Sequence, residues 1–169
     1  MGARPQIAVV GAGECAPELA EQARQVGEEL ARVGAVLLTG GRGGVMAAAS
    51  RGARAAGGTT LGILPGADAR QSPPNEGVDI AIFTGLGQAR NQVLVLSAAT
   101  VIAVGGGWGT LSEIATALKH GIPVVLLASW RLERPDGVAE PLLQRAASPQ
   151  EAVRIALAAA TSGSPDRGW

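Results

Sequence analysis

Short apolar runs alternate with longer amphipathic stretches along almost the whole chain. From these runs we predict strands at residues 7–10, 36–39, 60–64, 78–83, 101–104 and 124–128. Most of the runs are apolar at consecutive positions rather than at every second position. This pattern is typical of parallel strands that are buried on both faces of a sheet.

The stretches between the predicted strands have the composition of helices. We predict helices over residues 17–33, 45–56, 88–99, 111–120 and about 148–160. Pro17 suits a first helical turn, and Gly34 suits a helix end. Ser148 and Glu151 have the spacing of a capping box, with Pro149 at the first helical position. The polar, proline-containing segments 68–77 and 130–137 are predicted as loops.

Strands that alternate with helices predict an α/β fold of three layers, with helices on both faces of a mostly parallel sheet of six or seven strands. The length of 169 residues suits one domain. We assign that domain to residues 1–161 and expect a flexible C-terminal tail at 162–169. Such sheets bind ligands beyond the carboxyl ends of their strands, which is where the glycines of this chain gather.

The composition narrows the classes of function. The 14 basic and 14 acidic residues balance, and aromatic residues make up only 2% of the chain. We therefore expect no nucleic-acid partner, which would require a basic surface or stacking aromatics. Cys15 is the only cysteine, so neither an intrachain disulfide nor a cysteine metal cluster can form. With no apolar run of about 18 residues, we expect a cytoplasmic protein without a membrane partner.

The first glycine-rich segment follows the predicted strand 7–10. Gly11, Gly13 and Ala16 match G-x-G-x-x-A, a form of the dinucleotide-binding fingerprint in which small residues let the backbone approach a phosphate. The complete fingerprint has an acidic residue about 20 positions further on, and strand 36–39 ends without one. The segment therefore indicates either a ligand contact or a tight turn, and it disfavours an NAD-dependent oxidoreductase.

The second glycine-rich segment follows the predicted strand 36–39. Gly40, Gly41, Gly43 and Gly44 occupy four of five consecutive positions, and each of them costs conformational entropy on folding. The excess indicates that a ligand or another stretch of backbone comes very close, with a flexible connection as the alternative. Arg42 adds a positive charge to this segment.

The third segment, residues 105–113, follows a strand and opens a helix. Its backbone N–H groups would converge on an anion, helped by the helix dipole, and the Thr110 hydroxyl adds a donor. Glu113 has two interpretations: it completes a capping box with Thr110, or it is a carboxylate for acid–base chemistry beside the anion. Arg90, at the start of an earlier helix, is either a solvated surface residue or a ligand contact that pairs with Glu113.

Taken together, these residues resemble a known family. The pattern from Gly40-Gly41 to Met46, then Arg90, then Gly-Gly-x-Gly-Thr-x-x-Glu at 106–113, is similar to the Lonely Guy (LOG) family, whose members are often labelled lysine decarboxylases. The resemblance extends from the first strand to the helix that contains Glu113. It implies a Rossmann-like fold, a homodimer or higher homo-oligomer, and hydrolysis of the N-glycosidic bond of nucleoside 5′-monophosphates without a metal or other required cofactor.

The resemblance also implies roles for individual residues. Glu113 would be the catalytic carboxylate, and Arg90 its partner or a clamp on the substrate. A phosphate-binding set would surround them: Gly11, Gly13, Gly40, Gly41, Gly43, Gly44, Met46, Asn91, Gly106, Gly107, Trp108, Gly109 and Thr110.

Two departures point to a sister branch of that family. The hydrolases usually have proline where this chain has Gly105, and lysine where it has Asn91. The sister branch includes the molybdenum cofactor carrier proteins, which bind a phosphorylated pterin on the same loops. Two hypotheses follow: a phosphoribohydrolase acting on an AMP-like nucleotide, or a carrier or sensor of molybdenum cofactor or a related phosphorylated ligand.

Overall fold

The computed structural model describes residues 4–162, which form seven strands and five α-helices. The strands are β1 (Gln6–Val10), β2 (Val36–Thr39), β3 (Thr59–Leu64), β4 (Ile80–Phe83), β5 (Thr100–Val104), β6 (Val124–Leu127) and β7 (Leu143–Ala146). The helices are α1 (Pro17–Arg32), α2 (Gly44–Ala55), α3 (Arg90–Leu96), α4 (Trp108–Lys119) and α5 (Pro149–Ser162), with a 3₁₀ turn, η1 (Gly87–Ala89), before α3.

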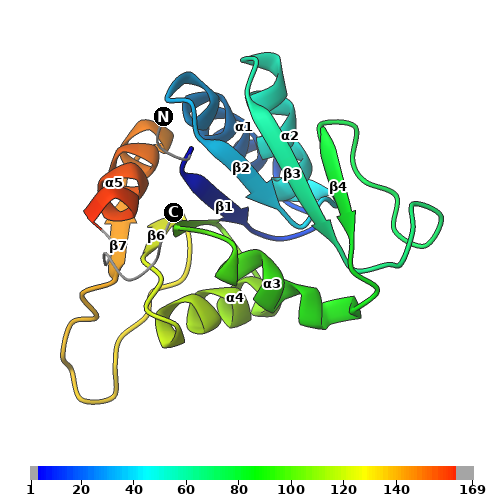
Figure 1. Ribbon diagram of the computed structural model, residues 1–169. Helices are drawn as coiled ribbons and strands as arrows, with labels where there is room; N and C mark the ends of the chain where they lie inside the picture. The colour runs from blue at the N-terminus through cyan, green and yellow to red at the C-terminus, as the bar shows by residue number, and fades with distance from the viewer. Residues whose placement is uncertain (1–3, 163–169) are drawn as a thin grey trace.

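The seven strands form one sheet in the order β4-β3-β2-β1-β5-β6-β7, and every neighbouring pair is parallel. The chain moves outward from β1 to the edge strand β4 and then returns to β5 on the other side of β1 (Figure 1). The strand order therefore reverses between β1 and β5. In an open parallel sheet, this reversal leaves a crevice at the carboxyl ends of the two strands.

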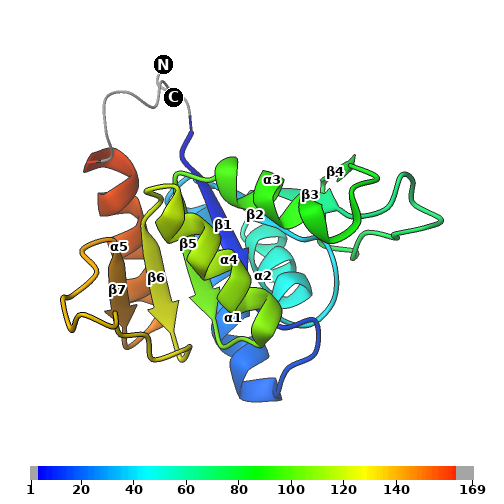
Figure 2. The ribbon, with the colours of Figure 1, turned by 90° about the horizontal axis from the view of Figure 1, so that it is seen from below.

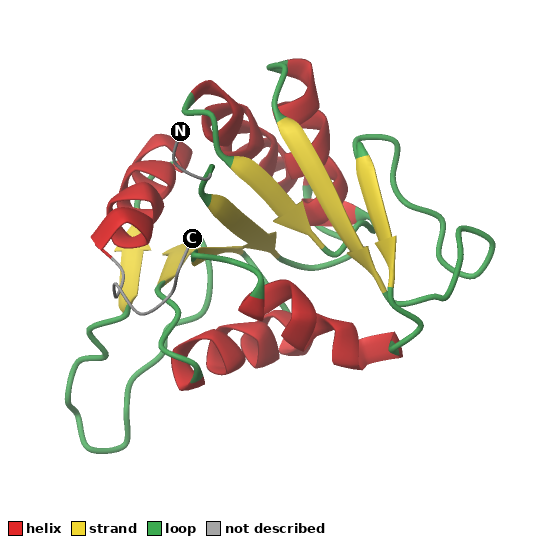
Figure 3. Ribbon diagram, viewed as in Figure 1, coloured by secondary structure: helices red, strands yellow, loops and turns green. Residues whose placement is uncertain are grey.

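Helices cover both faces of the sheet. Helices α1, α2 and α5 lie on one face, and α3 and α4 lie on the other (Figures 2 and 3). Alternate residues of the central strands feed the two cores: Ile7 and Val9 of β1 pack with the first group of helices, while Ala8 and Val10 pack with the second. This arrangement confirms the predicted three-layer α/β fold and explains the consecutive apolar runs.

The structure corrects several predicted boundaries. We did not predict β7, because its edge position leaves Gln144 and Arg145 exposed and removes the apolar run that identified the other strands. The predicted strand 78–83 begins only at Ile80, because Asp79 bonds to Thr60 and ends a turn. The predicted helix 88–99 begins as the turn η1 and ends at Leu96, three residues before Ala99 N–H joins the Gln6 carbonyl.

The C-terminal helix follows the predicted capping pattern closely. Glu151 N–H donates to the Ser148 hydroxyl at 3.2 Å, while the Glu151 carboxylate accepts from Ala147 N–H at 2.7 Å. The helix continues to Ser162, the first residue of the predicted tail. The other residues of that predicted tail, 163–169, lie outside the described residues. Of the helices within residues 4–162, none combines the length and apolar character that crossing a membrane requires.

Two glycines set the distance between α1 and α2. A Cβ on Gly52 would lie 1.9 Å from the Arg24 carbonyl oxygen, and one on Gly27 would lie 2.0 Å from the Ala49 carbonyl oxygen. Both neighbours are backbone atoms, which have no freedom to turn aside as a side chain does. The two helices therefore approach each other at a distance that only glycine permits.

We predict that Gly52→Ala destabilises the protein by about 1–3 kcal/mol, because the helices must separate to admit the methyl group. For a chain of this length, the melting temperature should fall by roughly 2–10 °C, as measured by thermal unfolding. Gly109→Ala is the matched control, because a Cβ at this helical glycine meets nothing within 4 Å. An equal loss of stability in both variants would contradict the packing argument.

Candidate functional site

A cavity of about 540 Å³ lies where the strand order reverses. Loops that follow β1, β2 and β5 form three of its sides, and the turn into α3 forms the fourth. The described residues that line it are Gly11, Ala12, Gly13, Glu14, Arg42, Gly43, Met46, Gln88, Arg90, Asn91, Gly107, Gly109, Thr110 and Glu113. The fold therefore brings together residues from three glycine-rich segments that are far apart in the sequence.

Three glycines keep this cavity open. A Cβ added to Gly13, Gly107 or Gly109 would meet nothing within 4 Å, so packing within the protein does not require glycine at these positions. None of the three has a positive φ that would require glycine either. Since all three line the cavity, their lack of a side chain leaves room for a bound group to approach the backbone.

Other glycines of the same loops allow protein segments to meet. A Cβ on Gly44 would lie 2.3 Å from the Ala12 carbonyl oxygen, and its φ of +58° also disfavours a side chain. Val45 N–H donates to that same oxygen at 3.1 Å, joining the first loop to the second. A Cβ on Gly41 would lie 2.8 Å from the Leu64 side chain. These glycines build the site rather than line it.

Two helix N-termini meet at the cavity without side-chain caps. The N-cap residues are Gly43 for α2 and Gly107 for α4, and neither helix has a side-chain hydrogen bond to its first turn. The first N–H groups of a helix have no partner within the helix, and the helix dipole places partial positive charge there. This is the arrangement by which helices bind anions in proteins.

Arg90 is a buried cation that lines the same cavity. Its side chain comes from the first turn of α3 and is only 6% exposed. Gly40 makes room for it, since a Cβ there would lie 2.5 Å from Nη1. The buried Nε and Nη1 atoms make no hydrogen bond within the described residues. Burial of a charge without a partner costs folding free energy. A bound anion would supply the hydrogen-bond acceptors that this guanidinium lacks.

Glu113 lies at the same cavity and is 8% exposed. Burial raises the pKa of its carboxyl from the usual 4.5 to about 7, although the positive charge of Arg90 opposes the rise. Burial and the charge of Arg42 lower the pKa of Arg90, while Glu113 raises it. No ion pair within 4.0 Å joins Arg90 to Glu113 in the described part of the chain, so their charges interact from a distance.

The capping interpretation of Glu113 is wrong. Helix α4 begins at Trp108 rather than at 111, and its N-cap is Gly107. Glu113 therefore lies in the second turn, too far along the helix to close a capping box with Thr110. The backbone geometry of three consecutive glycines starts the helix earlier than the sequence pattern indicated.

Most of the predicted site residues line the cavity, together with some that the sequence analysis did not select. Met46, Asn91 and Thr110 contribute side chains, and the Asn91 Oδ1 atom is buried without a partner in the described residues. Five predicted residues are not among its lining residues: Gly40, Gly41, Gly44, Gly106 and Trp108. Four lining residues are absent from the predicted set: Ala12, Glu14, Arg42 and Gln88. The sequence analysis noted Arg42 only as a positive charge on the second segment, and the other three lie between or beside predicted positions with no distinctive pattern of their own.

Trp108 is not among the residues that line the cavity, although its neighbours Gly107 and Gly109 are. Its side chain is 79% exposed. The ring packs against Trp130 with centroids 5.4 Å apart and planes tilted by 42°. This contact fixes the start of α4 against the segment that follows β6.

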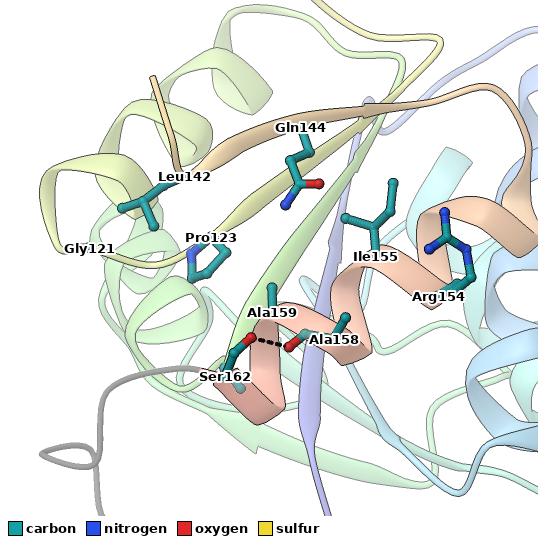
Figure 4. A pocket seen from close by; sticks show the side chains of 10 residues that line it. Gly121, Pro123, Leu142, Gln144, Arg154, Ile155, Ala158, Ala159 and Ser162 are labelled. Carbon is teal, nitrogen blue, oxygen red and sulfur yellow. Dashed lines mark hydrogen bonds between the residues drawn. The ribbon is translucent and has the colours of Figure 1, made fainter. Parts of the chain in front are cut away.

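A second cavity, of about 480 Å³, lies at the opposite edge of the sheet, between α5 and the segments that enter β5, β6 and β7 (Figure 4). Small and apolar side chains such as Pro123, Ile155 and Ala159 form much of its wall. The Ser162 hydroxyl donates to the Ala158 carbonyl, and the largely exposed Arg154 pairs with Glu151 at 3.6 Å. Its polar groups are therefore exposed or already bonded, and we assign no site to it.

The fold and the cavity define a Rossmann-like α/β protein whose glycine-rich loops and buried arginine face one crevice. The chain belongs to the SLOG cluster4 family, whose sequence pattern matches residues 4–159. This finding confirms the resemblance drawn from the glycine-rich segments.

Two solved structures are similar over almost the whole chain. The molybdenum cofactor binding protein from the phototrophic bacterium Rippkaea orientalis is 44% identical, with a TM-score of 0.83, over 92% of this chain and 97% of that one. The molybdenum cofactor carrier protein from Chlamydomonas reinhardtii is 38% identical, with a TM-score of 0.84, over 95% of this chain and 100% of that one.

A more distant relative has an enzymatic name. The cytokinin riboside 5′-monophosphate phosphoribohydrolase of Mycobacterium marinum is 33% identical over 121 residues, which make up 68% of this chain and 65% of the relative. This chain thus matches slightly less than two thirds of the length of that enzyme.

The buried Glu113 carboxyl leads to a prediction about stability and pH. Between pH 4.5 and 7 the folded protein binds more protons at Glu113 than the unfolded chain does, so folding is progressively weakened as the pH rises. Glu113→Gln keeps the shape and removes this effect. The stability of the variant relative to the wild type should therefore increase by up to about 3 kcal/mol from pH 4.5 to pH 8, as measured by urea unfolding.

Glu14→Gln is the control, because Glu14 lines the same cavity but is exposed to solvent. The change with pH should be larger in Glu113→Gln than in Glu14→Gln. A difference between Glu113→Gln and the wild type that stays constant over this pH range would show that the Glu113 carboxyl is not desolvated in the fold.

Proposed function

We propose that this protein binds a phosphorylated nucleotide-like or pterin-like small molecule, with the phosphate among Gly13, Gly107, Gly109 and Arg90. The observation that carries the proposal is the buried Arg90 guanidinium, whose Nε and Nη1 atoms have no partner in the described chain and which faces the glycine-lined cavity. A phosphate group accepts several hydrogen bonds and pairs well with a planar guanidinium.

The other groups at the cavity fit the same ligand. Thr110 is 3% exposed and its hydroxyl makes no hydrogen bond in the described residues, so it is available to a phosphate oxygen. The N-terminus of α4 has no side-chain cap and supplies backbone donors. The N-terminus of α2 adds partial positive charge, although its Val45 N–H already donates to the Ala12 carbonyl. Together they provide donors from several directions, as a tetrahedral anion requires.

A carrier or sensor role is favoured over hydrolysis by the backbone at Gly105. Its φ is +59°, whereas proline is fixed near −65°. The proline that LOG hydrolases usually have at this position is therefore incompatible with the loop of this chain. The two similar solved structures, of proteins that bind or carry molybdenum cofactor, support the same proposal. The ligand would then be a cargo, molybdenum cofactor or a related phosphorylated compound, rather than a substrate.

The phosphate placement predicts that Gly109→Val abolishes ligand binding without unfolding the protein. The added side chain would enter the open space that the phosphate oxygens need, removing charge-assisted hydrogen bonds worth about 1.5–3 kcal/mol each. We expect the affinity for ribose 5-phosphate to fall at least 100-fold in isothermal titration calorimetry.

Ala115→Val is the matched control, because it enlarges a side chain on the exposed face of the same helix. Its affinity should stay within about threefold of the wild type. Should Gly109→Val retain the wild-type affinity, the phosphate does not lie on this loop.

The second candidate function is hydrolysis of a nucleoside 5′-monophosphate, and Glu113 is the observation that favours it. A buried carboxyl with a pKa of about 7 exchanges protons readily near neutral pH, which suits a general acid or base. In its charged form it would also stabilise the oxocarbenium-like state through which a glycosidic bond breaks. The Arg90 guanidinium would hold the phosphate end of the substrate in place.

An assay for free adenine separates the two functions. The carrier proposal predicts that AMP incubated with the wild-type protein releases neither adenine nor ribose 5-phosphate above the level of a protein-free control. Release that disappears in Glu113→Gln would instead establish the hydrolase, with Glu14→Gln as the control for loss of a carboxylate at the same cavity. The cytoplasmic location and the homo-oligomeric state expected from the sequence complete this proposal.

A further inference from the structure

A smaller cavity adjoins the candidate site. It has a volume of about 290 Å³ and shares Arg42 and Gly43 with the larger cavity. Its other described lining residues, Gln71, Ser72, Pro73 and Asn75, all come from the segment between β3 and β4. A ligand whose phosphate lies in the larger cavity would therefore extend past Arg42 into this chamber.

Hydrogen bonds fix the wall of the chamber to the glycine-rich loop. Asn75 donates from its backbone N–H to the Gly41 carbonyl at 2.8 Å and from its side-chain Nδ2 to the Arg42 carbonyl at 2.8 Å. The Asp68 carboxylate accepts from the N–H groups of Arg70 and Gln71 at 2.9 Å, which orders the start of the same wall. Hydrogen bonds thus hold the segment against the loop that lines the phosphate site.

The two amide side chains of the chamber offer donors and have their oxygen acceptors occupied. The Gln71 Oε1 atom accepts from Ala67 N–H at 3.2 Å, and the Asn75 Oδ1 atom accepts from Gly77 N–H at 3.0 Å. Because an amide nitrogen cannot accept from an N–H, these bonds also fix the orientation of both amides. The Gln71 amino group then has no partner within the described residues, and neither has the Ser72 hydroxyl or the Arg42 guanidinium.

We propose that this chamber binds the heterocyclic ring of the phosphorylated ligand and prefers a ring edge with an oxo group beside a ring nitrogen, as in guanine, over an edge with an amino group there, as in adenine. The inference rests on the proposed function, because it takes the phosphate position as given. The lining residues include no acid, so the chamber does not favour a cation, and Pro73 provides its only apolar side chain. The planar Arg42 guanidinium suits stacking on a ring as well as donation to it.

The donor set distinguishes two common bases. Guanine presents two acceptors, O6 and N7, along one edge, whereas adenine presents an amino donor beside N7. The Gln71 amino group and the Arg42 guanidinium can donate to both guanine acceptors, whereas the adenine amino group offers them none. The loss is about 0.5–1.5 kcal/mol for a neutral hydrogen bond and about 1.5–3 kcal/mol for one to the guanidinium. The Ser72 hydroxyl can donate or accept, so it does not distinguish the two bases. A pterin with an oxo group on its pyrimidine ring offers acceptors of the same kind as guanine.

Calorimetric titration of three probes tests this inference: GMP, AMP and ribose 5-phosphate. We expect the wild-type protein to bind GMP at least tenfold more tightly than AMP, and more tightly than ribose 5-phosphate. In Gln71→Glu, an acceptor replaces the free amino group at nearly constant shape, so the preference for GMP over AMP should fall to about one or reverse. Both nucleotides have the same charge, so the added carboxylate cancels from their ratio.

Gln150→Glu is the matched control, because it adds the same charge to the exposed surface of α5, away from both cavities. It should leave the ratio of GMP to AMP affinity at the wild-type value. A wild-type protein that binds the three probes equally, that prefers AMP, or whose ratio is unchanged in Gln71→Glu would overturn the inference while leaving the phosphate site intact. Failure of all three probes to bind would instead refute the proposed function, and the inference with it.

Discussion

A guanidinium group keeps its charge at any physiological pH, and removing it from water without a partner costs folding free energy. Arg90 is in this situation: it is 6% exposed, and two of its nitrogens have no hydrogen bond within the described chain. Glu113 compensates for part of the charge from beyond ion-pair distance, but its own burial keeps its carboxyl half protonated near neutral pH. The site therefore retains an unsatisfied positive charge, which supports the proposal that its ligand is an anion.

The rest of the fold makes this burial possible. The reversal of strand order between β1 and β5 opens the crevice. The connection from β4 to β5 contains α3 and brings its first residues to the crevice. Gly40 leaves the space in which the guanidinium lies, while Gly44 lets the loops after β1 and β2 touch through their backbones. Gly13, Gly107 and Gly109 line the same cavity and have no side chains to fill it. The glycines thus divide into those that bring protein segments together and those that leave room for a ligand.

The sequence predicted the architecture well, because parallel strands buried on both faces leave long apolar runs and the glycines mark strand ends. It missed β7, whose edge position removes that signal, and it started α4 at Leu111 instead of Trp108 because three consecutive glycines have no helical propensity to read. The strand-end glycines predicted that the three loops meet, but the pairing of Arg90 with Glu113 at that place was one of two alternatives until the family resemblance favoured it. The desolvation of Arg90 and Glu113 was not predictable, since burial depends on which segments close over a side chain.

We propose that the buried Arg90 guanidinium binds an anion. Replacing Arg90 with methionine tests this directly. Methionine has a similar length and no charge, so Arg90→Met should preserve or raise the free energy of unfolding, because an uncompensated buried charge is removed. The same variant should lose at least 100-fold of the affinity for ribose 5-phosphate in a calorimetric titration beside the wild type. A folded Arg90→Met protein that binds ribose 5-phosphate as tightly as the wild type would contradict the account.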